Sequence, residues 1–550
     1  MEDGFLPASR GTVALKSDST LPQKRSPAAL AVGMGIFLSR IAGFVRDRVF
    51  AHYLGNSDAA GAFRAALRIP NLLQNLFGEG VLSASFIPVY ARLMAEGKQE
   101  DAQRMAGVVA TLLALSMSIL ALIGVMASHA LIDILAPGFS GEVRDVTETM
   151  VQIMFPGMAL LVLSAWCLGV LNSHRRFFLS YVAPVLWNIA IIATLFLFGG
   201  RFVSSSLEQM KLVELVSWGT VVGAALQLGV QIPMALRLNK GLKVSLNTSS
   251  ESVRAVIRNF FPALLTRGVV QLSAYIDQVL ASFLGPGAVA AMAYSQTISL
   301  LPVSLFGMSV STAELPEMSS AVGTDDEIAK ALRDRLSNGL KRISFYIIPS
   351  AAAFLVLGDV VVGTIFQTGK FLADDTLFVW LILAGSTVGL VATTQSRLCI
   401  SVFWALRDTR TPSKFAFLRV ILTGFFGYLV TFPLRTRFDW PVLYSAAGLT
   451  ASAGVAGWLE FLLIRNSLTR KIGYFSLGGS AIPKAWSAAL VASAVGYAVK
   501  LSLPLSHPFI TGVIVLGIYA VSYLALAWVF GLEEVSIVIR PVLRILNRRK

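Results

Sequence analysis

The segment GMGIFLSRIAGFVRD, residues 33–47, decides the fold, because it opens an apolar stretch long enough to cross a membrane and yet contains charges. A charged side chain at the depth of a bilayer costs roughly 3 kcal/mol or more, so it usually faces a cavity or a partner. The charged residues here are Arg40, Arg46 and Asp47. A second apolar segment follows at once and carries Arg64, Arg68 and Glu79. Together these residues predict a polar lining inside a membrane protein.

The composition of the whole chain supports this interpretation. Of its 550 residues, 55% are hydrophobic and only 14% are charged, and the mean hydropathy is +0.70. Soluble domains contain about 25% charged residues, whereas helices of about 20 apolar residues satisfy their own backbone groups in lipid. We therefore predict an all-α, polytopic membrane protein, since the sequence shows no series of the short alternating segments that a β-barrel needs. About fourteen spans are expected, near residues 29–54, 62–91, 105–130, 148–171, 179–199, 213–236, 256–284, 287–316, 343–366, 376–404, 415–433, 441–464, 483–502 and 508–530.

The distribution of Lys and Arg predicts the orientation of these spans. One alternate set of loops contains most of the basic residues, from Lys24 and Arg25 to the Arg548-Arg549-Lys550 tail. Cytoplasmic loops carry such an excess, so both termini are expected in the cytoplasm. The net charge of +15 is therefore attributed to topology and to contact with membrane lipids, and no nucleic-acid partner is expected. Residues 1–28 lack the apolar core of a signal peptide and are predicted to form a disordered cytoplasmic tail.

An internal repeat predicts two lobes. The sequence from Arg46 to Gly55 parallels that from Ile276 to Gly285, and Leu76-Phe77-Gly78 parallels Leu305-Phe306-Gly307. The offset is roughly 230 residues, or about six spans, which makes the repeat parallel, with its pseudo-axis along the membrane normal. We expect a first lobe over residues 29–236, a cytoplasmic linker over 237–255, a second lobe over 256–464, and two further helices with a basic tail over 465–550.

The charges of the first two spans fall on common helix faces. At 100° per residue, Arg40 and Asp47 lie within about 20° of one another. Arg64, Arg68 and Glu79 likewise share one face of the second span. Because basic residues predominate and the planar fork of arginine suits phosphate, these stripes predict a cationic cavity for an anionic substrate. In the alternative interpretation, the Arg46–Asp47 and Arg68–Glu79 pairs only hold the lobe together.

The second lobe carries fewer charges. Arg267 and Asp277 lie in the seventh span, and Arg397 lies in the tenth. Asp277, in the middle of its segment, is the candidate for a coupling cation or proton, the alternative being a structural salt bridge. Glu314 and Glu460 lie near the ends of predicted spans and are expected at the membrane interface.

Catalytic constellations are missing from the sequence. The four histidines lie far apart, no metal-ligand spacing occurs and no glycine-rich phosphate loop follows a strand. A membrane-bound transferase would need an acidic pair or a histidine at a loop mouth, and the pair Asp374-Asp375 falls on the predicted outer side. We therefore expect transport without bond chemistry, with no enzyme activity, no metal and no cofactor.

Several motifs resemble the MurJ/MviN family of lipid II flippases. The first lobe contains the blocks Ser39-Arg40-Ile41-Ala42-Gly43-Phe44-Val45-Arg46-Asp47, Arg68-Ile69-Pro70-Asn71-Leu72-Leu73 and Phe77-Gly78-Glu79-Gly80. Later matches include Phe366-Gln367-Thr368-Gly369-Lys370-Phe371 and Asp408-Thr409-Arg410-Thr411-Pro412. The resemblance implies the fold of the multidrug/oligosaccharidyl-lipid/polysaccharide exporter superfamily, with two lobes around a central cavity. It also implies alternating access that carries lipid II, the undecaprenyl-pyrophosphate-linked peptidoglycan precursor, from the cytoplasmic to the outer leaflet.

The resemblance also implies particular site residues. The family's cavity arginine and Arg-Asp pair fall on Arg40, Arg46 and Asp47, and its acidic residue of the second helix falls on Glu79. The polyprenyl tail would remain in lipid through a lateral gap between the first and eighth helices.

This chain departs from the family pattern at three places. Gln74-Asn75 stands where paired basic residues are expected, Gly61 replaces an acidic residue, and Thr297 replaces an arginine of the eighth helix. We hypothesise that Arg64 and Arg267 supply the displaced positive charge.

The resemblance further implies a setting and an energy source. The protein is expected in the bacterial inner membrane, where it would act in peptidoglycan biosynthesis, with lipid II and membrane lipids as partners and other cell-wall synthesis proteins as further candidates. Transport would be coupled to the membrane potential or to a gradient of Na⁺ or H⁺. The alternative function is export of another polyprenyl-linked oligosaccharide, or that of a related multidrug or polysaccharide exporter.

Overall fold

The computed structural model describes residues 27–202, 204–503 and 507–536, without the side chains of residues 27–32, 69, 79 and 265–274. Within these ranges every regular element is a helix, which confirms the predicted all-α class. The chain up to the linker forms α1 (Pro27–Leu54), α2 (Asp58–Phe77), α3 (Glu79–Ser85), α4 (Ile87–Ala95), α5 (Gln99–Met126), α6 (Ser128–Leu135), α7 (Gly141–Ser173), α8 (Phe177–Phe198) and α9 (Ser206–Leu238).

The remainder of the chain begins with α10, which follows an irregular segment at residues 239–250. Its elements are α10 (Glu251–Ser282), α11 (Pro286–Pro302), η1 (Val303–Met308), α12 (Ser309–Ser319), α13 (Asp325–Val356), α14 (Gly358–Phe366), α15 (Ala373–Thr387), α16 (Leu390–Ala405), α17 (Arg410–Leu429), η2 (Val430–Leu434), α18 (Arg435–Phe438), α19 (Val442–Ile472), α20 (Ala481–Ser502) and α21 (Pro508–Val529). The elements η1 and η2 are short π-helical segments that continue α11 and α17.

Each predicted span coincides with one helix or with a run of consecutive helices. Among the described residues, ten helices are long and apolar enough to cross a membrane, and the bent pair α15–α16 makes an eleventh. The helices α1, α2 and α10, which carry Arg46, Arg64 and Asp277, are not among them.

Local structure repeats where the sequence does. Gly55 and Gly285 both take positive φ, 59° and 103°, in the turns before α2 and α11. The second helix of each repeat is then interrupted, at Gly78 between α2 and α3 and at the π-helical η1, which contains Gly307. Glycine is the residue that adopts positive φ without a steric penalty, so both turns depend on it.

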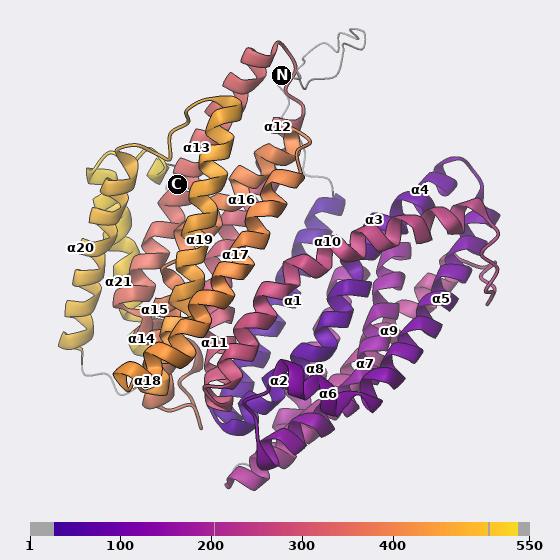
Figure 1. Ribbon diagram of the computed structural model, residues 1–550, viewed down its shortest axis with the longest axis horizontal. Coiled ribbons are helices and arrows are strands. Elements are labelled where there is room, and N and C mark those ends of the chain that lie inside the picture. Colours follow the sequence, from indigo (N-terminus) through magenta and orange to yellow (C-terminus); the bar gives the residue numbers. More distant parts are fainter. Residues whose placement is uncertain (1–26, 203, 504–506, 537–550) are drawn as a thin grey trace, which may run out of the picture.

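The two halves form two packed bodies whose ribbons diverge towards the ends of α12 and α4 (Figure 1). The helix α10 crosses between them: its first turns bury Val253 and Val256 against the first lobe, whereas it also packs along α17 of the second. The last two helices, α20 and α21, lie on α13 and α14. Tyr519 and Tyr523 fix this packing by donating hydrogen bonds to the backbone oxygens of Pro349 and Phe345, both at 2.7 Å.

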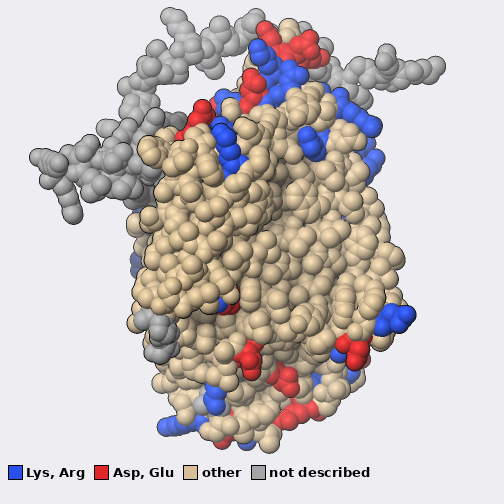
Figure 2. Space-filling model, turned by 90° about the vertical axis from the view of Figure 1, so that its left-hand side faces the viewer, with Lys and Arg blue, Asp and Glu red and all other residues tan. Residues whose placement is uncertain are grey.

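Charged side chains gather at the two ends of the molecule. Figure 2 shows an uncharged band between them on the face that carries α20 and α21, where large apolar side chains such as Val521 and Trp528 are exposed. This is the surface that a bilayer would cover.

The lobes are joined at the end of α1 that contains Leu54. Arg48 donates hydrogen bonds to the carbonyl oxygens of Thr364 and Ile365, at 2.7 and 2.5 Å. The backbone N of Lys370 donates to the oxygen of His52 at 2.8 Å. These contacts attach the first helix to the last turn of α14 and to the loop between α14 and α15 of the second lobe.

Candidate functional site

A cavity of about 970 Å³ lies between the lobes. Its walls come from helices of both repeats, chiefly α1 and α2 on one side and α10, α11, α16, α17 and α19 on the other. The lining includes five arginines and three carboxylates, which leaves a surplus of positive charge. These residues are Arg46, Asp47, Arg64, Arg68, Asp277, Arg397, Arg419 and Glu460.

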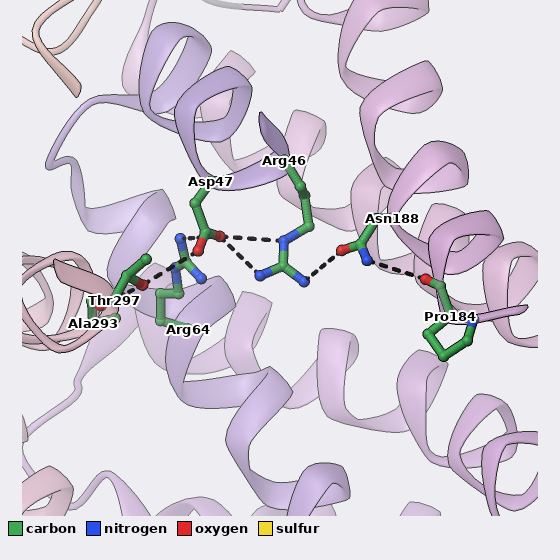
Figure 3. A network of polar contacts seen from close by, with 7 residues as sticks. All are labelled: Arg46, Asp47, Arg64, Pro184, Asn188, Ala293 and Thr297. Atoms are coloured by element: carbon green, nitrogen blue, oxygen red, sulfur yellow. Dashed lines mark hydrogen bonds and ion pairs between the residues drawn. The ribbon is translucent and has the colours of Figure 1, made fainter. Parts of the chain in front are cut away.

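Asp47 is the centre of the polar network on the first-lobe wall (Figure 3). Its Oδ1 atom accepts from Arg46 Nη2 at 2.9 Å and from Arg64 Nη2 at 3.0 Å. Its Oδ2 atom lies 3.3 Å from the hydroxyl of Thr297, on α11 of the opposite lobe. Asp47 is only 4% exposed, and a carboxylate at that depth is stable only when it is paired and hydrogen-bonded.

The two arginines of this network have further partners that hold their guanidinium groups in place. Arg46 Nη1 donates to Asn188 Oδ1 at 3.1 Å (Figure 3), and its Cζ lies 5.2 Å from the ring centre of Trp187. Arg64 Cζ lies 4.7 Å from the ring of Phe50 and 5.3 Å from that of Tyr294. Cation–π contacts of this kind replace part of the hydration that an arginine loses inside a membrane.

Neutral side chains of the α11–η1 region contact the arginines across the lobe boundary. Arg40 Nη1 donates to Ser304 Oγ at 2.7 Å, and Arg68 Nη1 donates to Gln296 Oε1 at 3.3 Å. Arg40 is exposed, and the residue that it contacts, Ser304, lies in η1, outside the cavity wall described above. This helical stretch is therefore the part of the second lobe that meets the predicted cationic stripe.

The second-lobe wall holds another group of charges. Arg419 Nη1 donates to Glu460 Oε2 at 3.1 Å. Asp277 has a buried Oδ1 atom without a hydrogen-bond partner among the described residues, and its nearest electrostatic influences are Arg419 and Arg68. Arg397 lies on the same wall and is exposed to the cavity.

The predicted site residues are thus placed as follows. Arg46, Asp47, Arg64 and Arg68 share the cavity with Asp277, the ion-coupling candidate, while Arg40 lies at the lobe boundary. The side chains of Glu79 and Arg267 lie outside the described residues. The described residues include no group of three or more His, Cys, Asp or Glu that could hold a metal ion.

Two cavity residues differ from the sequence-based expectation. Glu460 was expected at the membrane interface, but it is 5% exposed and lines the cavity, because it lies in the middle of α19 rather than near its end. Arg419 was not singled out, although it lies inside the predicted span 415–433. The rule that a charge at membrane depth faces a cavity would have identified it.

The structure accounts for the glycine at position 61. A Cβ atom at Gly61 would overlap the carbonyl group of Pro286, at the beginning of α11. An acidic side chain therefore has no room where α2 meets α11, and the two lobes approach here backbone to backbone.

Comparisons with known proteins agree with this architecture. The family model described as "Lipid II flippase MurJ" matches residues 50–521. The chain is 31% identical to the lipid II flippase MurJ of Burkholderia cenocepacia, over 81% of this chain and 84% of that protein. It is 30% identical to a probable lipid II flippase MurJ of Rhizobium meliloti, over 93% and 95% of the two chains.

Solved structures show the same fold. A lipid II flippase MurJ in an inward closed conformation superposes with a TM-score of 0.74 at 23% identity, over 94% of this chain and all of that one. An inward-facing multidrug-resistance transporter of the MATE family, in the MOP superfamily, superposes with a TM-score of 0.59 at 17% identity, over 80% and 98%. With a family match over most of its length and relatives at 30% identity or more, this chain belongs to the lipid II flippase MurJ family.

Proposed function

We propose that this protein carries lipid II from the cytoplasmic to the outer leaflet of the bacterial inner membrane. The observation that supports this most directly is the inter-lobe cavity, with five arginines against three carboxylates, in a chain of the MurJ family. A pyrophosphate head cannot cross about 30 Å of hydrocarbon unaided, and arginines can replace its hydration with charge-assisted hydrogen bonds. Since the family is one of flippases, the protein is a transporter rather than an enzyme.

The cavity charge favours lipid II over the substrates of drug exporters. A cavity for cationic drugs would be lined mainly by carboxylates, whereas here arginines predominate. The names of the relatives also favour lipid II over another polyprenyl-linked oligosaccharide. Other cell-wall synthesis proteins are proposed as partners only because lipid II is made and used by such proteins.

The proposed orientation places both termini and the basic loops in the cytoplasm. The contacts of Arg48 and Lys370 then lie on the outer side and keep the lobes together there. The ribbons diverge towards the opposite, cytoplasmic side (Figure 1). This arrangement fits the state that receives the headgroup from the inner leaflet, while the polyprenyl tail remains in lipid.

Alternating access then requires the outer contacts to break and the cytoplasmic halves to approach. We propose that the membrane potential or an ion gradient biases this exchange, with Asp277 as the ion-coupling candidate. Support for Asp277 is its buried, unpartnered oxygen on the cavity wall. The membrane potential also acts on the anionic substrate and on the cavity arginines. Moving one elementary charge across the membrane changes the free energy by about 2.3 kcal/mol per 100 mV.

Complementation tests the function directly. A bacterium depleted of its own flippase would express this chain, and the sidedness of lipid II would be measured by its accessibility from the outer face. We expect outer-leaflet lipid II and normal growth to return. If the protein reaches the membrane and lipid II nevertheless stays on the inner leaflet, the proposed function is wrong.

A further inference from the structure

The arginines of the two cavity walls differ in how fully they are engaged. Arg46 and Arg64 both donate to Asp47. The guanidinium of Arg397, on the opposite wall, makes no hydrogen bond or ion pair to any described residue, although it lines the same cavity. Arg419 uses Nη1 on Glu460, but its buried Nε atom has no partner within the described part of the chain. Arg64 on the first-lobe wall also has a buried Nε atom without a partner among the described residues, but its guanidinium is held on Asp47. Arg397 is therefore the cavity arginine whose guanidinium makes no hydrogen bond or ion pair within the described part of the chain.

The open donors of Arg397 and Arg419 are available to a ligand in the cavity. Arg397 is exposed there, and the buried Nε of Arg419 forfeits the hydrogen bond that it would make with water, a loss that is larger for a charged group. A membrane-embedded arginine with no acceptor is accordingly unusual and marks a substrate or ion pathway. Arg397 and Arg419 come from α16 and α17 and line the same wall of the cavity, where Arg419 acts electrostatically on Arg397.

We propose that Arg397 and Arg419 form a second anion-binding subsite, on the second-lobe wall of the cavity. This inference rests on the proposed function and assigns to the pair an anionic oxygen of the lipid II headgroup, from either the pyrophosphate or a peptide carboxylate. Arg397 makes the primary contact, because it has no competing acceptor. Arg419 contributes its open Nε edge while Nη1 remains on Glu460.

The local charge balance explains why Arg397 comes first. Glu460 forms an ion pair with Arg419, and Asp277 is attracted electrostatically by Arg419 and Arg68. Neither carboxylate lies within ion-pair distance of Arg397. A pyrophosphate that links two organic groups keeps a negative charge on each phosphate. One end of such a group, or a carboxylate beside it, can then satisfy Arg397 without displacing an existing ion pair.

The subsite gives the substrate a contact with each lobe. The first-lobe wall offers the Asp47 network and Arg68, and the second-lobe wall offers Arg397 and Arg419. An anion held by both walls links its own binding to the relative position of the lobes. A ligand shifts such an equilibrium only through differential contacts in the two states, and Arg397 supplies one.

Binding measurements with purified full-length protein test this subsite. The variants are Arg397→Gln, Arg397→Lys and the double variant Arg419→Gln/Glu460→Gln, which avoids leaving a buried carboxylate unpaired. Arg437→Ala is the matched control, because Arg437 is exposed on α18, away from the cavity. The probes are undecaprenyl pyrophosphate, lipid II, lipid II with amidated peptide carboxylates, and neutral undecaprenol.

We expect Arg397→Gln to weaken lipid II binding about tenfold or more, the usual scale of one charge-assisted hydrogen bond. Arg397→Lys should reduce the affinity for lipid II by a smaller factor, and Arg437→Ala should bind lipid II like the wild type. An equal loss for undecaprenyl pyrophosphate identifies the pyrophosphate as the bound group. A loss confined to lipid II with free carboxylates identifies the peptide. Binding of undecaprenol should not change.

Two other outcomes would refute the subsite. If folded Arg397→Gln and the double variant bind lipid II and undecaprenyl pyrophosphate as the wild type does, the subsite is refuted while the proposed function stands. If the wild type binds no lipid II, both proposals fall. The thermal unfolding temperature of each variant shows whether a loss of binding is a loss of folded protein.

Discussion

Gly61 and Pro286 bring the two lobes into direct backbone contact, α2 against the first turn of α11. Because a Cβ atom at position 61 would overlap the Pro286 carbonyl group, we expect Gly61→Ala to hinder closure at this end of the cavity. Lipid II translocation in complemented cells should fall several-fold, with Gly61→Asp more severe. The readout is outer-leaflet lipid II at equal expression.

The matched control for this prediction is Gly229→Ala in α9. A Cβ atom there meets nothing within 4 Å, so the added methyl group should leave transport unchanged. Equal transport by Gly61→Ala and Gly229→Ala would show that the close approach of α2 and α11 is not required during the cycle.

Asp47→Asn should remove the counter-charge shared by Arg46 and Arg64. Two guanidinium groups would then remain at membrane depth with only an amide between them. Breaking a buried ion pair in this way typically costs about 3–5 kcal/mol. We expect a lower unfolding temperature in detergent and a loss of complementation.

A second variant separates stability from transport at this position. Asp47→Asn/Arg64→Gln removes one charge of each sign, so it should recover much of the unfolding temperature but not the translocation. A single Asp47→Asn variant that unfolds and transports like the wild type would contradict the central role given to this carboxylate.

Exchanging the positions of two cavity residues tests whether Arg64 replaces the arginine that the family pattern places at position 297. Both Arg64 and Thr297 contact Asp47, from opposite lobes. We expect Arg64→Ala to abolish complementation and Arg64→Ala/Thr297→Arg to restore part of it, because an arginine at 297 can reach the same carboxylate.

The control for this exchange is Arg64→Ala/Ser299→Arg, which adds an arginine to α11 at a cavity-lining residue without a contact to Asp47. Rescue at 297 alone supports the compensation by Arg64. Rescue at both positions would mean that only the total cavity charge matters.

Asp408 lies before α17, outside the spanning segments, and gives a pH-dependent prediction. It accepts from Thr411 N at 3.0 Å, from the Thr411 hydroxyl at 2.7 Å and from Lys471 Nζ at 2.7 Å. Burial acts to raise its pKa, but the hydrogen bonds from Lys471 and Thr411 outweigh this and lower the pKa of Asp408 to about 2. The ionised group therefore stabilises the folded state above its unfolded pKa near 3.8, and this stability is lost as the pH falls towards 2.

Asp408→Asn should cost about 1 kcal/mol at neutral pH, the upper end of the usual range for a solvent-accessible ion pair such as that with Lys471. The difference in unfolding temperature from the wild type should shrink below about pH 4. Glu96→Gln serves as a surface-pair control, since Glu96 pairs with Lys98 in solvent and should change little. A difference for Asp408→Asn that stays constant from pH 7 to pH 3 would exclude the ionised carboxylate as its source.

The sequence predicted the all-α fold, and it drew attention to charged residues of the first lobe, because both depend on local patterns. Hydropathy locates spans, and the 3.6-residue period places Arg40 with Asp47. The same period cannot say which neighbouring helix a side chain meets. The pairing alternatives were therefore Arg46–Asp47 and Arg68–Glu79, while the structure adds Arg64 to Asp47 and directs Arg68 to Gln296.

Other parts of the site depend on contacts between distant segments. The carbonyl group of Pro286 limits the space for a side chain at position 61, and Glu460 is buried in an ion pair with Arg419. In both pairs the two residues lie far apart in the sequence. A hydropathy window sees neither relationship. The first relationship depends on how the two lobes pack against each other, and the second on how α17 packs against α19 within the second lobe.

Each of these bonds between the polar stripe and the opposite lobe has a neutral partner in the second lobe: Arg40 and Arg68 donate to Ser304 and Gln296, and Thr297 donates to Asp47. A hydrogen bond between a charged and a neutral group contributes about 1.5–3 kcal/mol net, whereas separating a buried arginine from a carboxylate costs about 3–5 kcal/mol. The hydrogen bonds that hold the lobes together here are therefore weak enough for thermal motion to break. Carboxylates at these positions would trap the protein in one state, so the modest strength of these bonds is a condition for repeated turnover.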